Sequence, residues 1–314
     1  MPIPVSAEVQ QIVQAFCNER RLAGVAASLV GDASITQLEW ELPKEAPQRE
    51  DRQIIESIRA AVAAGEDPLG EAFCRFRSLK HRRALGAVYT PRPIVDSMVA
   101  WAASEGPIER VVDPGCGSGR FLLAAARQFR NASLIAIEVD PLAALILRAN
   151  LALSGHAARA RVIVDDYRSV ELLPIKGSTL FIGNPPYVRH HDLSPEGKTW
   201  LAASAARAGI KASKLAGLHV HFFFKTAELA RARDIGAFVT SAEWLDVNYG
   251  EALRRLLANG LGGTSLHILD AKSAPFTGVA ATAAITCFRV GRRPANLTVR
   301  AVPAADQIGD LSKG

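Results

Sequence analysis

RVVDPGCGSGRFLL, residues 110–123, combines a short β-branched strand, a glycine-rich turn and the start of an amphipathic helix. The glycines let backbone and ligand approach each other where a Cβ would collide. A glycine-rich turn standing alone is often only a tight turn. Because this one follows a strand and opens a helix, we interpret it as the binding loop for a nucleotide-like ligand.

A second strand and helix follow directly. Ser133–Val139 is an apolar strand that carries Glu138 near its end, and Asp140 with Pro141 caps the next helix. Glu138 lies 19 positions after Gly119. Dinucleotide-binding folds hold a ribose diol with an acidic residue at this place, and a carboxylate can accept two hydrogen bonds. Glu138 is therefore a candidate ribose ligand.

Two further strands end in polar or aromatic residues. Ala160–Val164 runs into Asp165-Asp166-Tyr167, which offers an acceptor and an aromatic face to an adenine ring, or else is a plain strand-to-helix turn. Ser178–Ile182 is predicted as a buried strand, so the residues after it lie at the carboxyl edge of a sheet, where open α/β folds bind ligands.

The segment after that strand reads FIGNPPYV, residues 181–188. Each proline lacks an N–H, fixes φ near −65° and restricts the residue before it, so the loop is stiff and its carbonyls point outward. An amide at Asn184, outward carbonyls and the ring of Tyr187 suit a planar ring that bears an exocyclic amino group.

The segments before the glycine turn are predicted to be helical. Ser6 can cap a first helix, and isoleucines and a valine between residues 54 and 62 line a second one that ends near Gly65. Thr90 can cap a third helix that begins at Pro91. Six basic residues within 75–83 favour either phosphate contacts or a solvated helix face.

Composition limits the class of protein. The 314 residues are 49% hydrophobic and 22% charged, with a formal charge of +6 that permits nucleic-acid binding. No apolar run approaches membrane-span length, and the first ten residues lack the features of a signal peptide, so we predict a cytoplasmic protein without a membrane partner. The four cysteines are too scattered for a zinc site, and Arg189-His190-His191-Asp192 lacks a matching ligand pair, so no metal is expected.

The order of these motifs resembles the gamma-group N6-adenine DNA methyltransferases of restriction-modification systems. YTP at residues 89–91 precedes DPGCGSGRFLL, and IEVD, DDY, GNPPYV and a late PF follow. The resemblance, which covers residues 85–290, implies a mostly parallel Rossmann-like sheet of seven strands and S-adenosylmethionine as the methyl donor. It divides the chain into a helical segment (1–84), a catalytic domain (85–292) and a tail (293–314).

The same resemblance implies roles for individual residues. Donor contacts fall on Tyr89, Thr90, Pro91, Asp113, Gly115, Gly117, Glu138, Asp166 and Tyr167. Asn184 and the carbonyl of Pro185, followed by Pro186, would accept the hydrogens of the target amine, with Tyr187 and Phe276 on the two faces of a base flipped out of double-stranded DNA. Acceptors on both amino hydrogens free the nitrogen lone pair that is otherwise conjugated with the ring.

Two features depart from the family pattern. Gly217-Leu218-His219 replaces the usual Asp-Leu-Tyr type of sequence, and only 24 residues follow Val290. We therefore expect a target-recognition or specificity subunit on another chain, or a longer enzyme of which this chain is a fragment. Two alternatives stay open, namely a methyltransferase for protein glutamine or RNA bases and a non-catalytic subunit that binds S-adenosylmethionine.

Overall fold

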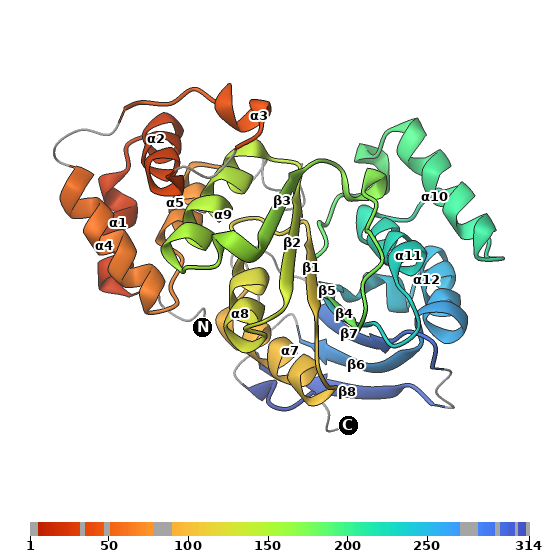
Figure 1. The fold of residues 1–314 in the computed structure, drawn as a ribbon. Coiled ribbons are helices and arrows are strands. Elements are labelled where there is room, and N and C mark those ends of the chain that lie inside the picture. The colour runs from red at the N-terminus through yellow and green to blue at the C-terminus, as the bar shows by residue number, and fades with distance from the viewer. Residues whose placement is uncertain are drawn as a thin grey trace.

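The computed structural model describes residues 6–31, 35–46, 51–77, 90–270, 282–292, 296–304 and 307–311. Its centre is one mixed sheet of eight strands in the order β3-β2-β1-β4-β5-β7-β6-β8 (Figure 1). The expected Rossmann-like α/β class is confirmed, whereas the expected count of seven strands is one too low.

The first five strands are parallel to one another. They are β1 (Arg110–Pro114), β2 (Ser133–Glu138), β3 (Ala160–Val164), β4 (Thr179–Gly183) and β5 (Ile235–Ser241). Every residue of β1 and β4 is buried. A parallel strand covered on both faces reads as a continuous apolar run, which is why these strands were recognisable in the sequence.

The antiparallel part of the sheet lies beyond β5. β7 (Ala283–Arg289) runs antiparallel to both β5 and β6 (Gly263–Leu269). β8 (Thr298–Val302) then pairs in parallel with β6, so the segment predicted as a tail supplies the eighth strand. Its local sequence did not indicate this, because β8 is mostly exposed and β6 supplies its pairing partners.

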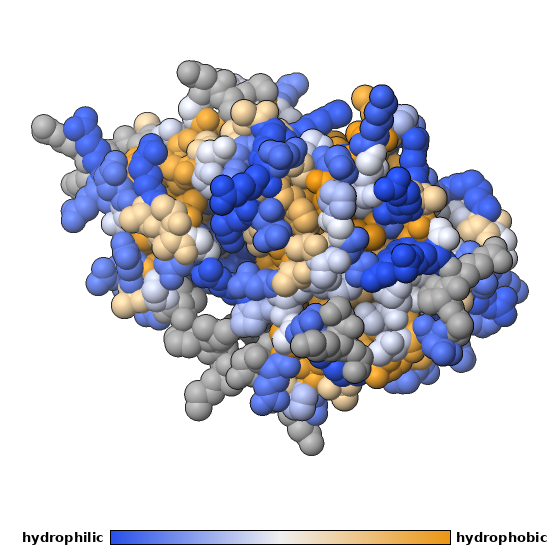
Figure 2. Space-filling view, turned by 60° about the horizontal axis from the view of Figure 1, so that its bottom comes forward, coloured by the Kyte–Doolittle hydropathy of each residue, from blue (hydrophilic) through white to orange (hydrophobic). Residues whose placement is uncertain are grey.

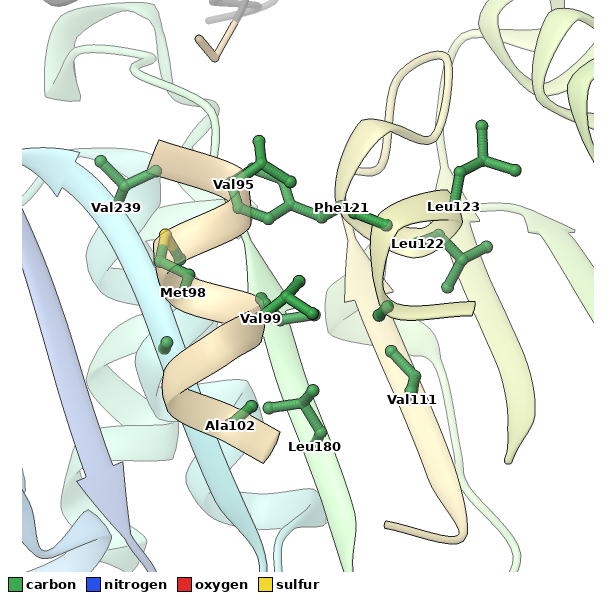
Figure 3. Close-up of a cluster of buried hydrophobic side chains, with 14 of the residues drawn as sticks. Val95, Met98, Val99, Ala102, Val111, Phe121, Leu122, Leu123, Leu180 and Val239 are labelled. Carbon is green, nitrogen blue, oxygen red and sulfur yellow. The ribbon is translucent and has the colours of Figure 1, made fainter. Parts of the chain in front are cut away.

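Three helices, α7 (Arg92–Ser104), α8 (Arg120–Gln128) and α9 (Pro141–Leu153), cover one face of the sheet. Figure 3 shows Val99 of α7 and Leu122 of α8 among the strand residues Val111 and Leu180. Asp140 caps α9 through bonds from Leu142 and Ala143, as predicted.

The opposite face carries α10 (Pro195–Arg207), α11 (Leu218–Leu229) and α12 (Glu251–Leu256). Three aromatic rings, Phe223 of α11 with Phe238 and Phe288 of the sheet, pack together with centroids 5.2 to 6.3 Å apart. Such burial of large apolar side chains is the main stabilising contribution to a fold.

The N-terminal helices are α1 (Ala7–Ala15), α2 (Glu19–Val30), α3 (Gln37–Trp40), α4 (Asp51–Ala63) and α5 (Pro68–Phe76). Ser6 caps α1 as predicted, but α2, α3 and α5 were not anticipated. In Figure 1 the N-terminal helices lie beside α9. They are not separate from the sheet domain, because they share a hydrophobic core with α9 that includes Leu145 and Ile146. The outer face of α9 is itself apolar and needs this cover.

On the face in Figure 2, apolar side chains form scattered patches among hydrophilic ones. Among the described residues, Leu38, Trp40, Val139, Leu173, Leu215, Leu297 and Val299 are the large hydrophobic side chains that remain exposed. No helix within the described ranges has the length and apolar character needed to cross a membrane.

Candidate active site

The glycine turn and the GNPPYV segment lie at adjacent strand ends. β1 has β2 on one side and β4 on the other, and the chain leaves β1 toward α8 but leaves β4 toward α11, on opposite faces of the sheet. Crevices at such a reversal point are the usual ligand sites of open α/β sheets. A cavity of about 290 Å³ occurs here, lined by residues from both loops.

The glycine turn shapes the floor of this cavity. Gly117 has φ of +54°, and an added Cβ would meet open space, so the cavity side of the turn is clear of protein atoms. Gly119 has φ of +94°, and a Cβ there would lie 2.2 Å from Cδ1 of Leu147, which makes it a packing glycine between α8 and α9. The backbone therefore approaches a ligand at one glycine and a helix at another.

Asp113 is the penultimate residue of β1, just before the glycine turn. Its Oδ2 accepts a hydrogen bond from the Leu122 amide at 3.0 Å, while its Oδ1 has no hydrogen-bond partner among the described residues. Burial raises the pKa of Asp113 well above its usual range; the Leu122 hydrogen bond opposes the rise and the charge of Glu138 adds to it. A buried acceptor of this kind suits a cationic or hydrogen-donating ligand.

Glu138 lines the cavity, where the sequence placed the ribose contact. Its Oε2 accepts from the Gly117 amide at 2.8 Å, and its Oε1 accepts from Val139 and Asp140. Burial raises the pKa of Glu138, although these backbone hydrogen bonds oppose the rise. Each carboxylate oxygen has two acceptor sites, so Oε2 can also receive a ribose hydroxyl.

Asp166 and Tyr167 follow β3 and also line the cavity. Burial acts to raise the pKa of Asp166, but hydrogen bonds and the charge of Arg168 outweigh it, so the pKa is lowered. Tyr167 is buried, its hydroxyl lies 3.0 Å from Oγ1 of Thr226, and its ring centroid lies 5.1 Å from that of Phe222. The two rings form an apolar wall beside the cavity.

These features fit S-adenosylmethionine. The open space before Gly117 admits a ligand, Glu138 offers acceptor capacity for a diol, and the Tyr167 and Phe222 rings suit an aromatic base, whereas Asp113 is not among the residues that line the cavity.

The residues before α7 differ from the prediction. Thr90 does not cap the helix, because Pro91 occupies the N-cap position without a side-chain hydrogen bond and α7 begins at Arg92. Thr90 is instead buried, lines the cavity and accepts a hydrogen bond from Nδ2 of Asn184 at 2.9 Å. Tyr89 lies outside the described residues.

The loop after β4 borders the same cavity. Asn184 and Pro186 line it, and Pro185 is buried. A Cβ on Gly115 would lie 3.4 Å from Cδ of Pro186, which is ordinary van der Waals distance, so the glycine turn and the proline loop lie side by side. Gly183 is required by a closer approach, since its Cβ would lie 2.8 Å from Oδ1 of Asp113. The predicted donor and target loops are thus neighbours on one cavity.

Of the two residues predicted to stack on the target base, the structure describes Tyr187. Tyr187 is partly buried, and burial raises the pKa of its hydroxyl far above the usual range. Phe276 lies outside the described residues.

Sequence reasoning missed several lining residues. Gly70, Phe73 and Cys74 come from α5, in the segment predicted to be separate, and Phe222 comes from α11. Asp67, the N-cap of α5, accepts from Ser118 of the glycine turn at 2.5 Å and from Asn150 at 3.0 Å. No local motif signals these contacts, although an aspartate before Pro68 is a typical helix start.

The departure at Gly217-Leu218-His219 lies next to the proline loop. The Leu218 amide donates to the carbonyl of Val188 at 2.9 Å, and Leu218 lines the cavity. His219 is buried, which lowers its pKa to about 4, so this ring is neutral at pH 7.

The rings of His190 and His191 contact each other edge to face. In the part of the chain that the structure describes, no group of three or more His, Cys, Asp or Glu side chains could hold a metal ion.

The fold is that of the class I S-adenosylmethionine-dependent methyltransferases. A class I methyltransferase structure from Listeria monocytogenes has a TM-score of 0.65 at 12% identity and covers 96% of this chain and 94% of that one. The structure of a DrdV-DNA complex has a TM-score of 0.66 at 16% identity, covering 98% of this chain and 39% of that one. At these identities the likeness concerns the fold alone.

Two family models point further, because the chain is similar to N6-adenine DNA methylases and to restriction-modification methylases. The N-6 DNA Methylase model matches residues 69–214, and the Eco57I restriction-modification methylase model matches residues 176–272. The Type II methyltransferase M.XamI of Xanthomonas campestris pv. amaranthicola is 50% identical over 300 residues, which cover 95% of this chain. The chain spans 56% of the length of that relative.

Proposed function

We propose that this chain transfers a methyl group from S-adenosylmethionine to the N6 amino group of an adenine in DNA, as the modification component of a restriction-modification system. The observation that carries the proposal is that the two loops line one cavity. Asn184 and Pro186 of the proline loop border it together with Gly115 of the glycine turn, so an amine held by the proline loop would lie beside the glycine turn. The match to the N-6 DNA Methylase model and the 50% identity to a Type II methyltransferase support the choice of DNA.

The chain's own residues would act mainly by positioning. Asn184 Oδ1 and the Pro185 carbonyl accept the two hydrogens of the target amine, which withdraws the nitrogen lone pair from conjugation and aims it at the cavity. S-adenosylmethionine, when bound, supplies a methyl carbon activated by its sulfonium. A bond from the amine nitrogen to the methyl carbon would form as the carbon–sulfur bond breaks, which leaves a neutral thioether, and the nitrogen would then release one proton to water. Alignment of the two reactants provides most of the rate enhancement.

We further propose double-stranded DNA as the substrate. An adenine in a duplex cannot reach the loop after β4, so the base must flip out, with Tyr187 and Phe276 as its stacking partners. Sequence recognition would come from another part of a longer enzyme or from a specificity subunit.

The test is to replace Asn184 by Ala and to measure both methyl transfer and donor binding. We expect Asn184→Ala to abolish transfer to adenine while the donor dissociation constant, measured by calorimetry, stays within about fivefold of wild type, because one lost hydrogen bond costs about 1 kcal/mol. Asn18→Ala is a control, since Asn18 caps α2 in the N-terminal segment and should leave transfer intact. An equal loss of binding and transfer in Asn184→Ala would mean that the loop is structural.

The alternative substrates use the same two acceptors on a glutamine amide or an RNA base. Incubation with labelled donor and a mixture of DNA, RNA and protein separates them. Label in DNA adenine supports the proposal; label confined to protein or RNA refutes it. Donor binding without transfer to any of the three would indicate a non-catalytic subunit.

A further inference from the structure

Thr90 sits between the donor cavity and the target loop. It is 3% exposed and lines the cavity. Its hydroxyl oxygen accepts a hydrogen bond from Nδ2 of Asn184 at 2.9 Å, across 94 positions of sequence. A threonine that caps a helix accepts a hydrogen bond from a backbone amide of that helix, but α7 has no side-chain cap. The Thr90 hydroxyl instead accepts from Asn184.

In this bond the asparagine amide turns its Nδ2 toward Thr90. The amide is planar, so placing Nδ2 against Thr90 also fixes the direction of Oδ1. A target amine needs an acceptor, and the productive orientation is therefore the one in which the nitrogen faces Thr90. The reversed amide would present two N–H groups to an amine that also donates.

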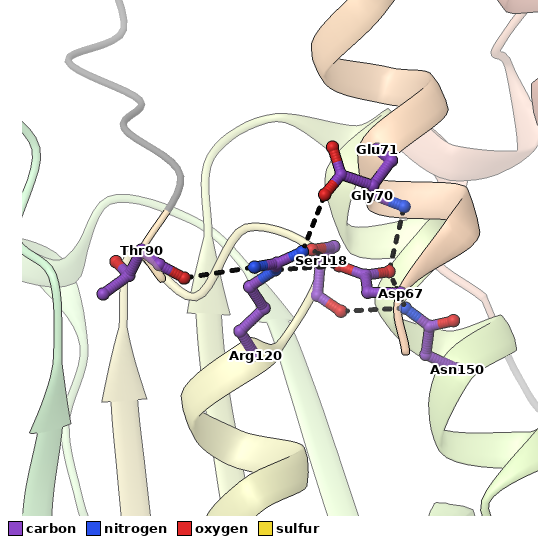
Figure 4. A network of polar contacts seen from close by, with 7 residues as sticks. All are labelled: Asp67, Gly70, Glu71, Thr90, Ser118, Arg120 and Asn150. Carbon is purple, nitrogen blue, oxygen red and sulfur yellow. Dashed lines mark hydrogen bonds and ion pairs between the residues drawn. The ribbon is translucent and has the colours of Figure 1, made fainter. Parts of the chain in front are cut away.

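Thr90 is itself held from a second direction. Nη1 of Arg120 donates to the Thr90 carbonyl at 3.1 Å. The guanidinium lies 3.2 Å from Glu71 and 3.5 Å from Asp67, both on or beside α5 (Figure 4). Charge-assisted contacts with two carboxylates restrict the guanidinium group of Arg120, and its hydrogen bond to the Thr90 carbonyl then restricts the backbone of Thr90.

We propose that Thr90 is a positioning residue that holds the Asn184 amide in its acceptor orientation, and that Arg120 fixes Thr90 in place. The donor contact that the family resemblance implies for Thr90 is a separate role. This proposal rests on the proposed function for its kinetic consequence, but the orientation of the amide can be measured without any transfer.

The kinetic test compares Thr90→Val, which keeps the shape but removes the acceptor, with Thr90→Ser, which keeps the hydroxyl. We expect Thr90→Val to lower kcat by about 10- to 100-fold, as misplacement of a catalytic group does. The donor dissociation constant should change less than threefold, and Thr90→Ser should retain kcat within about threefold. Thr199→Val on the exposed face of α10 is the control and should match wild type.

The structural readout is the side-chain amide signal of Asn184 in selectively ¹⁵N-asparagine-labelled protein, assigned by its loss in Asn184→Ala. We expect this signal to move in Thr90→Val and to move far less in Thr90→Ser. If wild type methylates no adenine, the proposed function fails, yet the amide signal still tests the orientation. An unmoved signal in Thr90→Val, an unchanged kcat, or a drop in donor affinity that accounts for the whole loss of rate would each overturn the proposal.

Discussion

Replacing Asp67 by Ala should uncouple the N-terminal helices from the glycine turn. Asp67 Oδ1 accepts from the Gly70 amide at 2.9 Å and from Asn150, while Oδ2 accepts from Ser118 and faces Arg120 at 3.5 Å. Loss of a helix cap costs about 1 kcal/mol, and loss of a buried hydrogen bond to a charged group costs about 2 kcal/mol. We therefore expect the free energy of unfolding to fall by about 3 kcal/mol.

The assay is thermal unfolding followed by circular dichroism, together with calorimetric titration of the donor. In a chain of 314 residues, a loss of this size corresponds to a decrease in Tm of about 4 to 5 °C. Donor affinity should also fall, because Ser118 belongs to the turn that lines the cavity. Glu56→Ala is the control, since its side chain is 78% exposed and should change stability by less than about 0.5 kcal/mol. A Tm within 1 °C of wild type with unchanged donor affinity in Asp67→Ala would refute the reasoning.

Two further predictions concern helices on opposite faces of the sheet, namely α11 and the start of α8. His221 is buried, and burial, followed by the charge of Arg168, lowers its pKa to about 3. Because its pKa in the unfolded chain is higher, the neutral ring costs no stability above about pH 6.5, but the free energy of unfolding falls as pH drops from there toward 3. His221→Phe keeps a ring stacked on Trp200 and should reduce the slope of this fall by about 1.4 kcal/mol per pH unit, measured from thermal unfolding at a series of pH values. An unchanged acid profile would contradict this prediction. Gly119→Ala should destabilise by about 2 to 4 kcal/mol, because φ is +94° and the new Cβ meets Leu147. In the double variant with Leu147→Ala, the loss in free energy of unfolding, measured by denaturant titration, should be smaller than the sum of the losses of the two single variants. A loss equal to that sum would mean that the two sites do not touch.

Much of the sheet could be predicted because its central strands are buried on both faces. β1 and β4 read as apolar runs, and the chemistry-bearing residues follow the strand ends in the sequence as they do in space. The order of motifs around these strands gave the class of protein before any contact was known.

The rest depended on contacts distant in sequence. α5 lines the cavity because Asp67 binds Ser118, and nothing near residue 67 indicates that partner. Thr90 has the local signature of a helix cap, but the amide of Asn184 competes for its hydroxyl. β8 is mostly exposed, so its own sequence pattern carries little signal.

The central claim is tested most directly by expressing the chain in a bacterial host that lacks adenine methylation and analysing the nucleosides of its DNA by mass spectrometry. The account predicts that N6-methyl-2′-deoxyadenosine appears with the wild-type chain and is absent with Asn184→Ala. DNA free of this nucleoside, with new methyl groups found on protein glutamine or on RNA bases instead, would contradict it.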